Sequence, residues 1–270
     1  MARKSRTSKS RTSKSRPSKM GRKWIQDDVL AYNIKVVYQD LQTFFGVTDL
    51  PPPNNEIHTF TGTAQDFAAA KDPETSYMLG SLDLINEVTD PQADNRVPYT
   101  IAFVRDLFDV LHYTDVPRRR EVMMRPTLRY LASQGRPPQV DICIMHRLTV
   151  IILVVKVNRP SRGFGPEPRL ISDTIAAFHN DDIMRVKRLG TDPLVSKVMP
   201  GIVMDGSMPT FYKIPVTPEL IRAVESGERP DEETVVHAYR PEVPRPEEGM
   251  RPLENRHIIL SCFEAFRQLL

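Results

Sequence analysis

The sequence has few cysteines and no long hydrophobic run. Its 270 residues include two cysteines, Cys143 and Cys262, which lie in apolar stretches and show no spacing typical of metal ligands. We therefore expect buried thiols in a reducing compartment and no disulfide framework. The most apolar stretch, residues 148–155, is far shorter than the roughly 20 residues that span a bilayer, and no apolar segment typical of a secretory signal begins the chain. The sequence thus predicts no membrane association.

The common catalytic and nucleotide-binding motifs are also missing. There is neither a Gly-x-Gly-x-x-Gly nor a Gly-x-x-x-x-Gly-Lys-Ser/Thr loop, which excludes the usual phosphate-binding loops. None of the six histidines belongs to a His-Glu-x-x-His motif. Ser207 follows Asp205-Gly206 but lacks the second glycine of a nucleophile elbow, so we interpret it as part of a turn.

Basic charge is concentrated at the N-terminus. Residues 1–23 hold ten of the 37 Lys and Arg residues and none of the 34 Asp and Glu residues. The rest of the chain therefore carries 27 basic and 34 acidic side chains, a net charge of −7. This division predicts a basic tail over residues 1–23 and a single, mildly acidic domain over residues 24–270.

The tail is a low-complexity repeat. Ser-Arg-Thr-Ser-Lys occurs twice over residues 5–14, and Ser-Arg-Pro-Ser-Lys follows at 15–19. With almost no apolar side chains to bury, this segment cannot offset its ordering entropy, so we expect disorder. Basic arms of this kind bind nucleic-acid phosphates or nuclear import receptors; the alternative is a solvated extension with no specific partner. The residues assigned to nucleic-acid contact are Arg3, Lys4, Arg6, Lys9, Arg11, Lys14, Arg16, Lys19, Arg22 and Lys23.

The first part of the body is predicted to be a helix followed by a loop-rich insertion. Apolar residues at steps of three and four predict one helix from near Asp27 to Gly46, with Leu30, Ile34, Val37, Leu41 and Phe44 on its buried side. Three prolines at 51–53 then require an extended link. Residues 54–96 are polar and weakly periodic, which indicates a long loop with a short helix or two.

The remainder predicts an α/β fold with a mixed central sheet flanked by helices. A helix from about Pro98 has Ile101, Val104, Phe108 and Leu111 on its inner face. Later elements are expected in this order: strands at 122–130, 140–145 and 149–157, a helix from 166, strands at 198–204 and 210–214, a helix from 217 to 227, and a last helix that includes residues 259–270.

The hairpin in this region resembles the PD-(D/E)XK nuclease superfamily. Asp141 begins one arm, just after Pro137-Pro138, and a long apolar strand forms the other. The resemblance implies a restriction-endonuclease-like core of a helix, a β-meander and a helix, in which two carboxylates hold Mg²⁺ and a lysine helps to activate water. The stretches 149–159, 168–178 and 208–217 are also similar to a group of uncharacterised fungal proteins with this core, and the likeness covers roughly residues 97–270.

The chain departs from the family at the catalytic motif. No Asp or Glu occurs between Asp141 and Glu167. Where the fungal group has Glu-Asp-Lys, this chain has Val157, Asn158 and Arg159. A shorter register uses Val154 and Lys156, and it also lacks the acid because valine cannot ligate a metal.

The resemblance therefore implies a degenerate catalytic set, Asp141, Lys156 and Arg159, with Arg169 as a further nucleic-acid contact in place of the group's Gln. Asp173 or Glu167, on the following helix, is an alternative source of the missing carboxylate. Mg²⁺, held by Asp141 and Asp173, is expected only if catalysis survives; otherwise we expect no cofactor. The simpler interpretations are that Asp141 is a strand-end carboxylate and that the helix acids favour the helix N-terminus.

Three functions follow from these observations. The favoured hypothesis is a catalytically inactive nuclease-fold protein that associates with nucleic acid, with the tail giving nuclear targeting and phosphate contacts. The first alternative is a Mg²⁺-dependent endonuclease with a relocated carboxylate. The second is a protein-interaction module with no nucleic-acid role, whose tail binds an import receptor. We expect the protein in the nucleus or the cytoplasm, with the nucleus favoured.

Overall fold

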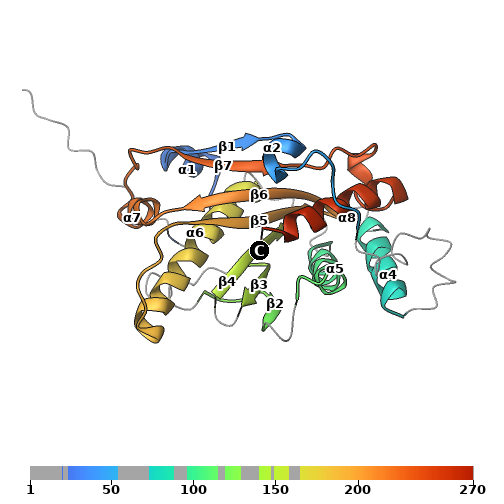
Figure 1. The fold of residues 1–270 in the computed structure, drawn as a ribbon, viewed down its shortest axis with the longest axis horizontal. Helices are drawn as coiled ribbons and strands as arrows, with labels where there is room; N and C mark the ends of the chain where they lie inside the picture. The colour runs from blue at the N-terminus through green and yellow to red at the C-terminus, as the bar shows by residue number, and fades with distance from the viewer. Residues whose placement is uncertain are drawn as a thin grey trace, which may run out of the picture.

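The computed structural model of the chain describes residue 20 and residues 24–53, 73–87, 96–114, 119–128, 140–146, 149–157 and 165–269. These residues form a seven-stranded mixed sheet between two sets of helices (Figure 1). The predicted mixed α/β class is therefore confirmed.

The strands lie in the order β1-β7-β6-β5-β4-β3-β2 across the sheet. Strands β2, β3 and β4 form one antiparallel meander and β5, β6 and β7 another, while β4 pairs with β5, and β7 with β1, in parallel. Their bounds are β1 Ile34–Tyr38, β2 Arg120–Met124, β3 Ile142–His146, β4 Thr149–Val157, β5 Lys197–Asp205, β6 Met208–Val216 and β7 Thr234–Tyr239.

The helices fall into two sets, and each set packs in a different hydrophobic core. Alternate strand residues such as Ile202 and Val203 belong to different cores, because successive side chains of a strand point to opposite faces. Ile202 packs in the core that contains residues of α2, α4, α5 and α8, and Val203 in the core that contains residues of α1, α6 and α7. The helices are α1 Gln26–Ala31, α2 Leu41–Phe45, α4 Pro73–Glu87, α5 Arg96–Val110, α6 Pro166–Met184, α7 Pro218–Ser226 and α8 Leu253–Arg267, with a π-helix at Arg185–Leu189 and a 3-10 helix at Pro246–Glu248.

The predicted starts of α6 and α7 and the predicted end of α7 are confirmed. The Thr217 hydroxyl accepts a hydrogen bond from the backbone N–H of Leu220, Pro218 occupies the first turn, and Gly227 ends α7 in the left-handed conformation. Helix α6 begins at Pro166, as the proline pattern predicts. The predicted inner face of α5 is buried throughout, at Ile101, Val104, Phe108 and Leu111.

The predicted helix from Asp27 to Gly46 is wrong in its middle. Residues 26–31 and 41–45 are helical, but residues 34–38 form strand β1. Ile34 and Val37 fit a helical stripe, yet Ile34–Tyr38 also places residues with high β propensity beside β7, and pairing with that distant strand decides the outcome. Gly46 does end α2, with a φ of 76°.

Other predicted boundaries need smaller corrections. The strand expected over residues 122–130 ends at Met124, where Arg125 has a φ of 48° and Pro126 follows. Within residues 54–96 the structure describes one helix, α4, of 15 residues. Strand β7 was not predicted. Of the tail, only Met20 is described: it is 6% exposed and packs in the same core as Trp24, while the predicted disorder otherwise concerns residues outside the described ranges.

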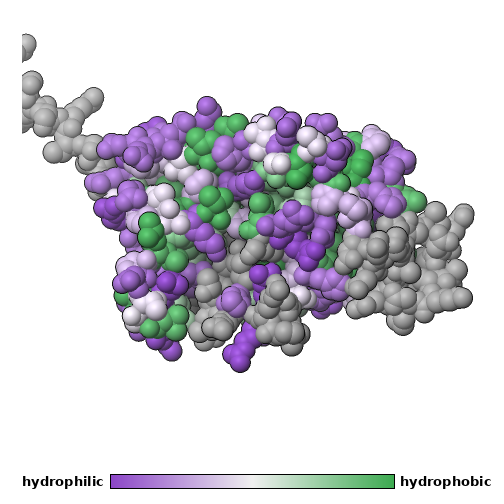
Figure 2. Space-filling view, in the orientation of Figure 1, coloured by the Kyte–Doolittle hydropathy of each residue, from purple (hydrophilic) through white to green (hydrophobic). Residues whose placement is uncertain are grey.

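The surface in Figure 2 is largely hydrophilic, with a few separate hydrophobic patches. The exposed large hydrophobic side chains from the end of α6 to the start of β5 are Val186, Leu189, Val195 and Val198. None of the helices that the structure describes has both the length and the apolar character required to cross a membrane.

Candidate functional site

One end of the sheet collects the residues that the sequence singles out. The strands β4, β5, β7 and β1 all run toward this end, whereas β3 and β6 start from it. The N-terminus of α6 also lies here, because this helix follows β4 and its first residues line a cavity with the end of β5. Ligands of open α/β sheets commonly bind beyond the carboxyl ends of parallel strands, so this end is the natural place for a site.

Asp141 lies directly before β3 at this end. Its side chain is 5% exposed, and its backbone carbonyl accepts a hydrogen bond of 2.8 Å from the N–H of Arg125. Burial raises the pKa of Cys143, two residues further on, to about 12, and the carboxylate of Asp181 adds to the effect. Asp141 is therefore buried at the start of this arm of the hairpin and is not a solvent-facing strand end.

Lys156 lies near the end of the adjacent strand. A β-bulge between Val154 and Lys156 shifts the pairing with β5, so that the Cα of Lys156 lies opposite Val203. Of Lys156, only this backbone pairing is described. Arg159 and the ten basic tail residues assigned to nucleic-acid contact lie outside the described ranges.

Helix α6 carries the other predicted site residues. Asp173 is 8% exposed, on a helix most of whose residues are buried. Arg169 is half-buried in the first turn of α6 and does not line either cavity at this end of the sheet. Within the described ranges, no group of three or more His, Cys, Asp or Glu side chains is placed to hold a metal ion. The described side chains thus do not form the two-carboxylate Mg²⁺ site that the resemblance implies. We assign no metal-dependent step to them.

Glu167, in the first turn of α6, is held by two tyrosines. Its Oε2 atom accepts hydrogen bonds from the hydroxyl groups of Tyr212, at 3.0 Å, and Tyr38, at 3.3 Å. Burial raises the pKa of Tyr212, and the neighbouring Glu167 carboxylate raises it further. Both hydroxyls are therefore protonated donors at neutral pH, which fixes the orientation of the carboxylate.

These residues line the first of two adjoining cavities. The first, of about 360 Å³, is lined by residues of β1, β5, β6 and α6 that include Tyr38, Glu167 and Tyr212. The second, of about 450 Å³, is lined by the turn after β5 and by the loop around residues 246–249. The two share Asp205, Met208 and Arg240, and we call them together the strand-end cleft.

Arg240 stands between the two cavities. It follows β7 and is exposed, and among the described residues its guanidinium makes no hydrogen bond or ion pair. It is close enough to Tyr38 to lower the pKa of that hydroxyl, against the larger effect of burial, which raises it. An arginine so placed is available to an anionic group of a ligand.

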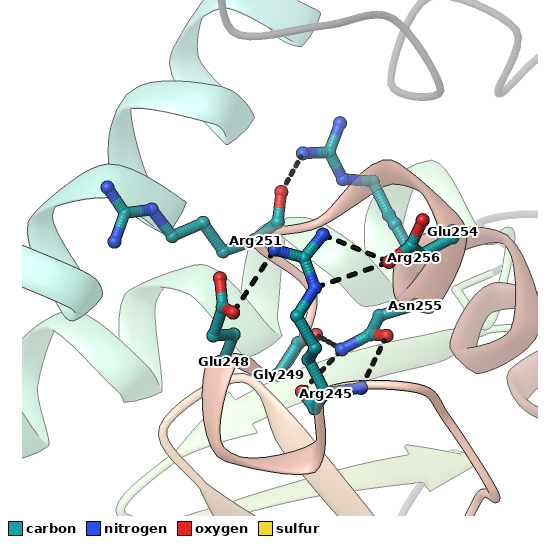
Figure 3. Close-up of polar contacts among 7 residues, drawn as sticks. All are labelled: Arg245, Glu248, Gly249, Arg251, Glu254, Asn255 and Arg256. Carbon is teal, nitrogen blue, oxygen red and sulfur yellow. Dashed lines mark hydrogen bonds and ion pairs between the residues drawn. The ribbon is translucent and has the colours of Figure 1, made fainter.

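The loop that walls the second cavity is fastened to α8 (Figure 3). The Asn255 side chain donates to the carbonyls of Arg245, at 2.6 Å, and Gly249, at 2.8 Å, and accepts from the N–H of Arg245. Arg245 also pairs with Glu248 and Glu254. The buried Arg256 donates to the carbonyls that precede α8. These contacts hold the loop that lines the second cavity in one position against α8.

Tyr38, Asp205, Tyr212 and Arg240 were not predicted as site residues. Tyr38 falls within the helix predicted from Asp27 to Gly46, and Arg240 lies outside every predicted element, so neither had a pattern that indicated chemistry. Tyr212 lies within residues 208–217, a stretch on which the proposed resemblance to the fungal group is based, and Glu167, also in the cleft, was considered as a source of the missing carboxylate. Their proximity depends on the pairing of β1, β6 and β7, whose residues are distant in sequence.

Comparison with known proteins gives no further guide: no family model matches the chain, and no curated protein matches it significantly.

Proposed function

We propose that the protein is a nuclease-fold protein that associates with nucleic acid and does not cut it efficiently. The observation that carries the proposal is the order helix, three-stranded meander, helix, strand in α5-β2-β3-β4-α6-β5, with Asp141 and Lys156 at the same end of adjacent strands. This order agrees with the restriction-endonuclease-like core that the sequence resemblance implies.

The loss of cutting rests on the missing carboxylate. Val154 stands two residues before Lys156, and no acid occurs on β4. Two-carboxylate sites depend on both acids to hold and position Mg²⁺. A site reduced to Asp141 retains one buried carboxyl group at the sheet end without the second carboxylate that the chemistry needs.

Association with nucleic acid rests mainly on the tail. The ten basic residues of the tail suit phosphate contacts that need no fixed geometry, and they also suit recognition by a nuclear import receptor. The acidic body, of net charge −7, does not favour phosphates as a whole, so the tail supplies most of the attraction.

The test incubates the full chain and its Asp141→Asn variant with plasmid and single-stranded DNA, in Mg²⁺, in Mn²⁺ and in EDTA. We expect no metal-dependent cutting by either protein, and binding of labelled DNA by both at low salt. Cutting that the variant loses would overturn the proposal in favour of an active enzyme, with Asp173 and Glu167 as the carboxylates to replace next. No binding at any salt concentration would favour a protein-interaction module.

A further inference from the structure

The strand-end cleft has the size and the polar groups of a small-ligand site. Its first cavity, about 360 Å³, falls in the range of about 300–1,000 Å³ that is typical of such sites. Three groups on its wall are available to a ligand. They are the exposed ring of Tyr38, the guanidinium of Arg240 and one carboxylate oxygen of Glu167.

The ring and the cation suit a base and its phosphate. Tyr38 is 60% exposed, and its hydroxyl is tied to Glu167, so the ring is held in place while much of its surface stays accessible. Held aromatic rings are the usual stacking surfaces for unpaired bases. Arg240, which makes no hydrogen bond or ion pair with a described residue, is placed to meet a phosphate.

The carboxylate suits a base edge with an amino group. Both tyrosine hydroxyls bond to Oε2 of Glu167, and Oε1 accepts no hydrogen bond from the described part of the chain. Asp205 provides a second carboxylate on the same wall. Adenine, cytosine and guanine present exocyclic amines to such acceptors. Uracil and thymine present an N–H that lies between two carbonyl oxygens. A carboxylate repels these oxygens, so it accepts a hydrogen bond less well from these two bases.

We infer that the strand-end cleft binds one unpaired nucleotide, stacked on Tyr38, with its phosphate at Arg240 and an exocyclic amine at Glu167. This inference rests on the proposed association with nucleic acid and names its ligand as a single-stranded segment or a strand end. The same chemistry occurs in a free nucleoside monophosphate, so the two sources are tested separately.

The experiment measures affinities of the full chain by calorimetry and fluorescence anisotropy. The probes are adenosine, the monophosphates of adenosine, cytidine, guanosine and uridine, and single-stranded oligonucleotides at high salt, where the contribution of the tail is screened. The variants are Arg240→Ala, Tyr38→Ala and Glu167→Gln. Arg222→Ala is the matched control, because Arg222 is an exposed arginine on α7 that pairs with Glu219, away from the cleft.

Each variant has a distinct expected result. Tyr38→Ala weakens every nucleotide about 5- to 150-fold, the range for one base–aromatic stack. Arg240→Ala weakens the monophosphates about tenfold or more and leaves adenosine unchanged, since adenosine has no phosphate. Glu167→Gln removes the preference for amine-bearing bases over uridine. Arg222→Ala binds like the unchanged chain.

The outcomes separate this inference from the proposed function. Oligonucleotide binding that is the same in the unchanged chain and in the Tyr38 and Arg240 variants overturns the cleft as a nucleotide site and leaves association through the tail. Absence of all oligonucleotide binding at low salt overturns both. Circular dichroism spectra that match the unchanged chain exclude misfolding, and Tyr38→Phe, which keeps the ring, should retain most of the stacking. If only oligonucleotides respond to the variants, the ligand is a strand and not a free nucleotide.

Discussion

At the scale of single residues, Gly249 shows why one loop position accepts no side chain. It has a φ of 54° and a ψ of −131°, a conformation that is unfavourable for any residue with a Cβ. A Cβ at this position would also collide with the Oγ of Ser207. That Oγ accepts a hydrogen bond of 2.9 Å from the N–H of Met250 and cannot move away without losing it. Glycine here brings the loop of residues 246–249 against the turn after β5.

We expect Gly249→Ala to lower the free energy of unfolding by about 3 kcal/mol, from backbone strain and overpacking together. Gly190→Ala is the matched control, because Gly190 also has a positive φ, of 61°, but a Cβ there would meet no atom within 4 Å. The control should lose only about 1 kcal/mol. Urea denaturation followed by circular dichroism measures both, and equal losses would show that the contact with Ser207 costs nothing.

At the scale of elements, α8 is joined to the preceding loop by a fully buried amide. Asn255 is 0% exposed, and its side chain bonds to three backbone groups, two on Arg245 and one on Gly249. The bond to Gly249 is buried and those to Arg245 are part-buried, so they are better shielded from water than the exposed ion pair. The start of α8 thereby sets the position of the loop that walls the cleft.

Replacement of Asn255 by Ala should lower the free energy of unfolding by about 2–4 kcal/mol, because the buried carbonyl of Gly249 and the part-buried backbone groups of Arg245 lose their partners. Glu254→Ala removes the neighbouring ion pair to Arg245, which is exposed, and should change stability little. Thermal and urea denaturation of the two variants make the comparison. A larger loss in the Glu254 variant would mean that the ion pair, and not the amide, fastens the loop.

At the scale of the whole molecule, charge is divided between a basic tail and an acidic body. The tail carries ten positive charges and the rest of the chain a net charge of −7. If six to ten tail charges contact phosphates, affinity for DNA should fall by about 10³- to 10⁵-fold between 50 and 200 mM salt. The cleft adds one arginine to this effect and therefore little salt dependence.

Replacement of the ten tail Lys and Arg residues by Gln should remove most of the dependence of DNA affinity on salt. Each phosphate contact contributes about 0.9 to the slope of log affinity against log salt concentration on double-stranded DNA. A variant with the six tail serines changed to Ala keeps the charge and should keep the slope. Anisotropy titrations at several salt concentrations give these slopes, and an unchanged slope in the Gln variant would place the phosphate contacts elsewhere.

Local signals in the sequence determined many of the helices and central strands. The apolar stripe of α5, the proline and threonine at the start of α7 and the Val/Ile/Leu run of β4 each favour one structure from near neighbours alone. The division of charge is also fixed by the sequence. The strand predicted over residues 140–145 is found at Ile142–His146, and Asp141, expected near its start, lies directly before it.

Only the tertiary structure decided the edge of the sheet and the cleft. Residues 34–38 fit a helix by spacing, and they became β1 because β7, some 200 residues later, offers a parallel partner. That pairing brings Tyr38 and Arg240 beside Glu167. Contacts between residues so far apart leave no periodic trace in the sequence. The candidate binding surface therefore follows from strand pairing, which no local pattern records.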